Sequence, residues 1–250
     1  MAKRFTLVAV AIFLVAPSNG IAAASSVSAP DSVDTPAYAQ LLQVAERLGM
    51  VRGMQRTWRS INRVNFAGQG DCLLGEVVKG SCFIEMNYVA DAARIESDDQ
   101  PIAVFAEGKR WQESKPGVPV EGVEVLSSPP PLALILTPHG VIRAALEAET
   151  SNPGSVSHRT LGDGNEEFQF QDGVRSIVVS IDEGMPVSIV VTAEGEMTEV
   201  VLDEYTDWEL LDVLFPKIFR ITRKGGEQID LAVTSFRTNP YVIFPLPAKE

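Results

Sequence analysis

The residues best suited to acid–base chemistry are two histidines, His139 and His158, and two carboxylate pairs, Glu166-Glu167 and Asp203-Glu204. Hydrolysis through a nucleophile needs a Ser or Cys beside a base that an acidic group orients. Neither histidine stands in a recognisable nucleophile motif. Adjacent residues of a strand point to opposite faces, so the carboxylate pairs are expected at solvated edges. The sequence therefore favours a protein that is not an enzyme. A hydrolase using His139 or the carboxylate pairs is the weakest of three hypotheses.

The chain has two cysteines, Cys72 and Cys82. In an exported protein, two cysteines close in sequence indicate a disulfide, and free buried thiols are the alternative. A redox pair would need a C-x-x-C spacing, and a zinc site would need more ligands than this chain groups together. Neither a G-x-x-x-x-G-K-[ST] loop nor a strand-to-helix G-x-G-x-x-G loop occurs. We therefore expect a structural disulfide, no metal and no cofactor.

The N-terminus has the pattern of a secretory signal peptide. Lys3 and Arg4 precede an apolar run over residues 5–16, and the small residues Ala22 and Ala24 precede Ser25. The run is about a dozen residues long, whereas a membrane-spanning helix needs roughly 20. We therefore predict a cleaved signal peptide over residues 1–24 and a flexible leader over 25–35. The mature protein is expected in the periplasm or outside the cell, with no transmembrane segment.

The charge balance excludes one class of partner. The chain has 33 acidic and 21 basic residues, a formal net charge of −12, and loss of the signal peptide with Lys3 and Arg4 makes the mature charge more negative. Such a charge repels nucleic-acid phosphates and anionic lipid surfaces, and the sequence has no local run of basic residues that would override this repulsion. The sequence therefore predicts no nucleic-acid partner.

Strand patterns dominate the chain from residue 63 onward. Hydrophobic stretches between residues 166 and 239 are separated by Asp172-Gly173, Glu183-Gly184 and Glu194-Gly195. Acidic-Gly pairs accept the positive φ of tight hairpin turns, so this spacing predicts an antiparallel up-and-down sheet. Earlier strands are predicted over residues 64–70, 81–89, 92–97, 102–107 and 109–112, and a further hairpin turn at Gly225-Gly226.

Two helices interrupt the strand pattern. Thr35 and Thr137 each precede a proline, the arrangement of an N-cap followed by the first helical residue. The first helix is expected to end at Gly49, and the second covers residues 139–149, with His139 at a surface or capping position. A short amphipathic piece with Val51, Met54, Trp58 and Ile61 follows the first helix. The helices either pack onto the core or form a lid across the open mouth of a sheet. We predict a single mainly β (α+β) domain over residues 36–250.

Aromatic residues are the best candidates for binding. In a closed core they would simply pack, whereas on the concave face of a half-open barrel they would line a cavity for an acyl chain or apolar peptide. Phe168 and Phe170 share a face, as do Ile177, Val179 and Ile181 on the next strand. The candidate ligand-binding aromatic residues are Trp58, Phe66, Phe83, Phe105, Trp111, Phe168, Phe170 and Trp208.

The last strands resemble those of the periplasmic lipoprotein-carrier (LolA/LolB-like) superfamily. The resemblance rests on residues 214–221 with their internal Pro216, the Gly225-Gly226 turn and residues 229–240, which end in Asn-Pro. It implies an unclosed antiparallel β half-barrel whose apolar concave side is covered by a helical lid and holds lipid or lipoprotein acyl chains. It also implies that Arg94, in the strand Arg94-Ile95-Glu96, is the inward polar residue that tethers the lid.

These observations lead to a main hypothesis and an alternative. The main hypothesis is an exported, soluble binding protein that sequesters an apolar ligand, either a lipid or the acyl chain of a lipoprotein. The alternative is a protein-interaction or regulatory module of the cell envelope that uses the same fold without lipid cargo.

Overall fold

The computed structural model describes residues 33, 35–52, 57–73, 77–98, 100–122, 124–127, 131–223 and 228–240. The predicted signal peptide, most of the leader, Met54 and the Gly225-Gly226 turn lie outside these residues. In the described part of the chain, no helix is both long and apolar enough to cross a membrane.

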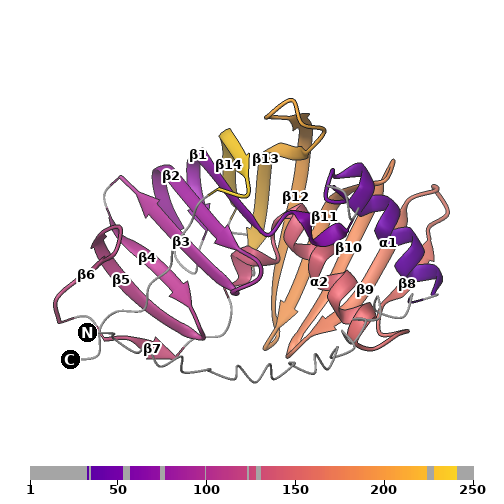
Figure 1. The fold of residues 1–250 in the computed structure, drawn as a ribbon, viewed down its shortest axis with the longest axis horizontal. Coiled ribbons are helices and arrows are strands. Elements are labelled where there is room, and N and C mark those ends of the chain that lie inside the picture. The colour runs from indigo at the N-terminus through magenta and orange to yellow at the C-terminus, as the bar shows by residue number, and fades with distance from the viewer. Residues whose placement is uncertain are drawn as a thin grey trace, which may run out of the picture. The chain divides into compact units, whose positions relative to one another are not determined.

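One antiparallel sheet of 14 strands organises the described residues (Figure 1). Its order is β6-β5-β4-β3-β2-β1-β14-β13-β12-β11-β10-β9-β8, with β7 pairing with β5 beside this path. The order begins at β6 and ends at β8 without closing into a barrel. This topology confirms the predicted fold class, a mainly β, unclosed half-barrel. The strands are β1 Arg63–Leu73, β2 Val77–Asn87, β3 Ala92–Ser97, β4 Gln100–Ala106, β5 Lys109–Lys115, β6 Val118–Pro119, β7 Leu126–Ser127, β8 Ser157–Thr160, β9 Glu166–Asp172, β10 Arg175–Asp182, β11 Met185–Ala193, β12 Glu196–Asp207, β13 Leu214–Arg223 and β14 Gln228–Thr238.

The acidic-Gly pairs form the predicted hairpin turns. Glu183 and Gly184 have φ angles of 48° and 77°, and Glu194 and Gly195 have 52° and 79°. Two successive positive φ angles match the twist of the flanking strands, which explains why the chain uses a glycine at the second position of these two turns. At the third pair, Asp172 stays in the ladder opposite Arg175, so Gly173 and Val174 form the turn. From β8 to β14, consecutive strands are therefore neighbours in the sheet, and β14 then pairs with β1.

Both predicted helices form where their caps place them. In α1 (Pro36–Arg47), the N–H of Tyr38 donates to Thr35 Oγ1 at 3.2 Å. In α2 (Pro138–Ser151), the N–H of Gly140 donates to Thr137 Oγ1 at 3.2 Å. These bonds satisfy amide groups that lack a partner inside the helix. The short amphipathic piece predicted after α1 is described only from residue 57, and there it is a single 3₁₀ turn, η1 (Trp58–Ser60). A second 3₁₀ turn, η2 (Leu132–Leu134), precedes α2.

The two helices cover one face of the sheet, in front of β8–β12 in Figure 1. Directly paired residues of neighbouring strands lie on the same face, so the register reveals an apolar row beneath the helices. The row crosses five strands through Phe168, Val179, Ile189, Val200 and Ile221, all of them buried. The buried apolar residues of the helices belong to the same core: Ala37, Leu41, Val44 and Ala45 from α1, and Val141, Ile142, Ala145 and Leu146 from α2.

The register of the β1–β2 hairpin contradicts the predicted disulfide. Cys72 is paired with Val78, whereas Cys82 is paired with Gly68. The two cysteines are therefore offset by four residues along the ladder, or roughly 13 Å at about 3.3 Å per residue. A disulfide requires Cα atoms closer than about 7 Å. Proximity in sequence was misleading because Cys72 pairs close to the turn of the hairpin, whereas Cys82 lies four residue pairs further along the ladder.

One buried carboxylate ties the two helices together. Glu149, fully buried near the end of α2, accepts a hydrogen bond from Thr35 Oγ1 at 2.6 Å. It also accepts the N–H groups of Gly154 at 2.8 Å and Val156 at 2.9 Å. Burial would raise the pKa of Glu149, but these hydrogen bonds outweigh it and lower the pKa below its ordinary value. The carboxylate is therefore ionised and links the start of α1 to the chain after α2.

We predict that Glu149→Gln lowers the free energy of unfolding by about 2–3 kcal/mol, because an amide cannot accept all of these donors and leaves buried groups unpaired. Because the folded pKa is lowered, this contribution is present above the ordinary carboxylate pKa and is lost as the pH falls through the folded value. Urea unfolding at pH 7 measures the loss. The control is Glu196→Gln on the exposed start of β12, where the change should stay within about 0.5 kcal/mol. Equal stabilities for the two variants would contradict this role.

Candidate functional site

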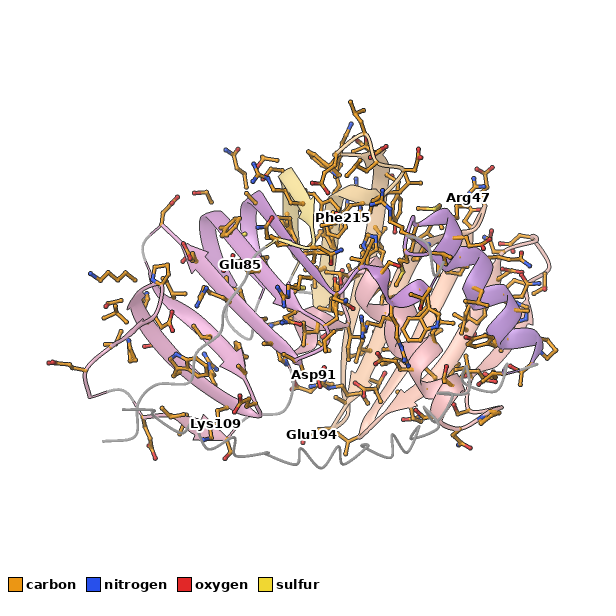
Figure 2. The ribbon with its side chains drawn as sticks, in the orientation of Figure 1. Arg47, Glu85, Asp91, Lys109, Glu194 and Phe215 are labelled. Carbon is orange, nitrogen blue, oxygen red and sulfur yellow. The ribbon has the colours of Figure 1, made fainter. Side chains whose placement is uncertain are left out.

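The helix-covered face of the sheet is the candidate site, and its central part is aromatic. Phe66 of β1 lies 5.2 Å from the ring centroid of Phe215 and 5.9 Å from that of Phe219, both on β13. Phe236 of β14 stacks on Phe215 at 4.1 Å. The rings meet because β1, β14 and β13 are adjacent in the sheet and these residues share a face. We name Phe66, Phe215, Phe219 and Phe236 the phenylalanine cluster (Phe215 is labelled in Figure 2).

His139 of α2 packs against this cluster, which corrects the prediction of a surface or capping position. Its side chain is fully buried, and its ring lies 5.8 Å from both Phe215 and Phe236. Neither ring nitrogen makes a well-formed hydrogen bond within the described residues. Burial lowers the pKa of His139 to about 4, and the nearby carbonyl of Leu48 opposes this only in part. A neutral histidine enclosed by phenylalanine rings is not placed to act as a catalytic base on a solvent-borne substrate.

The rim of the site shows that the sheet curves around α2. A pocket of about 320 Å³ is lined by Tyr88 and Asp91 from the β2–β3 turn and by Asp172 and Gly173 from the β9–β10 turn. In a flat sheet, β2 and β9 would be about 34 Å apart, since seven strand spacings of about 4.8 Å separate them. Their turns instead line one pocket, together with residues of α2. We call this region, where the β2–β3 and β9–β10 turns approach each other around Arg143 of α2, the mouth of the half-barrel.

Arg143 of α2 is the principal polar residue at this mouth. Its side chain is largely buried, and its Nε donates to Glu147 Oε1 at 2.9 Å. Its Nη1 donates to Asn62 Oδ1 at 3.0 Å, and its guanidinium lies 5.8 Å from the ring of Trp58. Arg59 lies 4.7 Å from the same ring, so two cations flank one indole. The helical pattern gave no signal for this role, because an arginine among apolar helix positions reads as part of the solvated face.

Two further groups at the mouth have perturbed acidities. Burial raises the pKa of Tyr88, whose hydroxyl lies 2.9 Å from Thr137 Oγ1. Burial also raises the pKa of Asp91, and the carboxylate of Asp172 raises it further. Asp91, near the lower ends of the central strands in Figure 2, is thus close to the carboxylate of Asp172, which belongs to a strand far from β2 and β3 in the order of the sheet. The mouth is therefore polar, with cations and carboxylates held close together.

The residues predicted to bind the ligand divide between the two faces of the sheet. Those on the helix-covered face that belong to the main core or pack against it are Trp58, Phe66, Phe168, Phe170 and Trp208. Phe105 shares this face, because it pairs with Ala93 of the core, but it lies outside the main cluster. Phe83, Arg94 and Trp111 lie on the opposite face. The structure thus brings together five of the predicted aromatic residues, along with Phe215, Phe219 and Phe236.

Arg94 makes its contacts away from the helices, so it does not tether a lid. Its neighbours in sequence, Ala93 and Ile95, belong to the core under the helices, and alternation turns Arg94 to the other face. There its Nη1 lies 3.0 Å from Glu85 Oε2, and its Nε lies 3.5 Å from Glu113 Oε2. Figure 2 labels Glu85 on β2. The link between the helices is made by Glu149 instead.

The apolar face is filled by side chains of the helices. The described pockets lie around it and have mixed polar and apolar linings: one of about 650 Å³ between α1 and the β10–β11 turn is lined by Gln43, Arg47 and Glu183, among others. Another of about 470 Å³ adjoins the mouth at Arg59 and Arg143. An apolar ligand would therefore reach the face of the sheet only where helix side chains move away.

No protein-family model matches the chain, and no curated protein matches it in sequence. Among solved structures, it is similar to a LolA superfamily protein from Nitrosomonas europaea, with 10% identity, coverage of 82% of this chain and 94% of that one, and a TM-score of 0.44. It is also similar to a DUF1329 family protein from Desulfovibrio piger, with 9% identity, coverage of 84% and 96%, and a TM-score of 0.42. A LolA superfamily protein is thus among the similar structures, as the resemblance of the last strands predicted.

We predict that His139→Leu removes a pH dependence of stability. The folded pKa of about 4 lies below the ordinary value near 6.5, so the unfolded chain binds the proton more readily. The stability of the native protein should then fall by roughly 3 kcal/mol as the pH is lowered from about 6.5 to 4. Thermal unfolding across this range measures the slope. His139→Leu should flatten it, whereas the control His158→Gln should retain it; a native slope in His139→Leu would contradict the assignment.

Proposed function

We propose that this chain is an exported binding protein that shelters a lipid, or the acyl chain of a lipoprotein, on the helix-covered face of its sheet. The predicted signal peptide supports a location in the periplasm or outside the cell. The open antiparallel sheet with a continuous apolar face supports the binding of hydrocarbon. The working step is the exchange of helix side chains for the ligand.

The observation that carries the proposal is the composition of the α1 interface. The buried residues of α1 are all apolar: Ala37, Leu41, Val44 and Ala45. Its described ties to the rest of the chain lie at its two ends, where Thr35 Oγ1 donates to Glu149 and the N–H of Leu214 donates to the Leu48 carbonyl at 3.2 Å. An acyl chain could therefore replace the middle of α1 without leaving buried polar groups unpaired.

The same comparison favours α1, not α2, as the helix that moves in this proposal. The buried residues of α2 include His139, Arg143 and Glu149. Removing α2 would break the hydrogen bonds of Arg143 and Glu149, and an unpaired buried charge is strongly destabilising. Displacement of the middle of α1 exposes apolar side chains and no buried charge of that helix, so in this proposal α2 remains as the fixed part of the cover.

The energies of the exchange are of similar size. A chain of about 14 carbons gains on the order of 10 kcal/mol on burial, at about 0.8 kcal/mol per CH₂. Exposing the two larger buried side chains of α1, Leu41 and Val44, costs about 1.5–3 kcal/mol each, or roughly 3–6 kcal/mol together. Immobilising the ligand costs roughly 4 kcal/mol or more. Binding is then a near-balanced exchange that needs no covalent step, and the ligand can be released again.

The polar mouth supports a second candidate, an interaction module of the cell envelope without lipid cargo. Arg59 and Arg143 flank Trp58 at the rim of the face, and tryptophan and arginine are the side chains that most often dominate protein interfaces. Affinity purification from envelope extracts distinguishes the two functions. A stoichiometric protein partner and no lipid would favour the module.

We predict that Thr35→Ala speeds the uptake of a fluorescent fatty acid by about five- to tenfold, because loss of the α1 N-cap favours the displaced helix by about 1 kcal/mol. Thr35→Ser keeps the hydroxyl and is the matched control, with uptake unchanged. Stopped-flow fluorescence measures the rate, and native mass spectrometry of the purified protein measures bound lipid. The proposal fails if the protein carries no lipid and the wild type takes up no fatty acid.

A further inference from the structure

The loop that joins β12 to β13 presents two leucines to solvent. Leu210 is 88% exposed and Leu211 is 47% exposed. In Figure 1 this loop stands at the upper end of β12, beside the C-terminal end of α1. A single exposed leucine is ordinary on a protein surface. This loop differs because its polar side chains form hydrogen bonds that hold the backbone that displays the leucines.

Three polar side chains hold the loop. Asp207 accepts the N–H groups of Leu211 at 3.1 Å and Asp212 at 2.8 Å. Glu209 Oε2 accepts the N–H of Thr238 at 2.9 Å and its hydroxyl at 2.8 Å. The indole N–H of Trp208 donates to the Phe215 carbonyl at 3.1 Å. The loop is therefore fixed to β13 and β14 as a preformed surface.

The backbone of the loop is held in an unfavourable conformation. Leu210 and Asp212 have φ angles of 55° and 57°, in the left-handed region that favours glycine. A leucine there is uncommon, and such strain persists only where the surroundings determine the conformation. Here the hydrogen bonds of Asp207 supply that determination. The conformation directs an apolar side chain outward where a glycine would relax the loop.

The loop also contacts the chain that follows the C-terminal end of α1. Arg52 Nη2 donates to the Leu211 carbonyl, and a side chain at Gly49 would come within 2.0 Å of the Asp212 carbonyl oxygen. Gly49 is itself in the left-handed region, with φ of 75°. The loop and the turn after α1 are therefore in direct backbone contact.

The charge around the leucines indicates the kind of partner. Between residues 203 and 212 the sequence has five acidic residues and no Lys or Arg. Two arginines reach this segment from elsewhere, Arg220 at Asp203 and Arg52 at the Leu211 carbonyl, so acidic side chains remain in excess, five against two. An anionic membrane surface would be repelled by this rim, whereas a protein surface with an apolar socket and basic margins would be attracted. Preformed rigidity also suits a protein socket, because it limits the entropy lost on docking.

We propose that the Leu210–Leu211 loop is the docking point of a partner protein that has an apolar socket flanked by Lys or Arg side chains. Docking itself does not depend on lipid binding. The loop lies beside the end of α1, so a bound partner would contact the segment that secures the helix we expect to move. This effect on α1, unlike docking, rests on the proposed function.

Site-specific photocrosslinking in cells that make the full-length protein tests the proposal. A benzophenone amino acid replaces Leu210 and, as a matched control, Val174, which is 81% exposed in the β9–β10 turn. We expect one discrete protein adduct from position 210 and none from position 174. The partner, identified by mass spectrometry and purified, should bind the Leu210→Ser/Leu211→Ser variant at least about tenfold more weakly. It should also bind the wild type more weakly at high salt, and the Val174→Ser variant unchanged.

The other outcomes overturn the proposal. Lipid adducts, or sedimentation with phosphatidylethanolamine–phosphatidylglycerol vesicles that the double serine variant loses, would make the loop a membrane contact. An adduct with a second copy of the chain would make it a self-association site, and no adduct would leave the leucines without a docking role. Fatty-acid uptake by the double serine variant without partner should equal that of the wild type, so failure of docking and failure of lipid binding are separate results.

Discussion

The structure depends on the need to cover one apolar face of an open sheet. Alternation along each strand places Phe168, Val179, Ile189 and Val200 in a directly paired row, and none of them can be left in water without loss of stability. Closure into a barrel would hide such a row, but β6 and β8 end the sheet unpaired with each other. Two helices therefore supply the missing side of the interior, and their apolar stripes determine which face is buried.

The two helices cover this face in different ways. Helix α2 combines an apolar stripe with buried polar residues whose partners lie elsewhere in the chain, as Arg143 with Asn62 and Glu149 with Thr35. Helix α1 contributes aliphatic packing and is secured at its ends. This asymmetry makes the packing of α1 almost purely apolar and that of α2 partly polar, and it is the reason why we propose α1 as the exchangeable part of the cover.

Patterns among neighbouring residues predicted most of the helices, turns and strand faces, but little of the polar mouth around Arg143. The caps at Thr35 and Thr137, the acidic-Gly turns and the shared face of Phe168 and Phe170 follow from neighbouring residues, and the structure confirms them. The burial of His139 and the polar mouth around Arg143 did not follow, because both arise from segments that meet only when the sheet curves. The Cys72–Cys82 pairing failed for a related reason: a hairpin register sets distance, and separation in sequence does not.

Because helix side chains already fill the interior, the free energy of binding an apolar ligand would differ from that in a fold with an empty cavity. A preformed empty cavity would gain the full transfer free energy of a ligand, whereas in the function we propose each buried methylene of the ligand would replace a leucine or valine side chain that was already buried. The affinity would then depend on the difference in free energy between burying the ligand and burying the helix, and small changes at the ends of α1 would shift it. The hydrogen bond from Leu214 to the Leu48 carbonyl places one such end under the same loop that exposes Leu210. The physical coupling between surface and interior therefore passes through the turn at Gly49, where the two backbones are in contact.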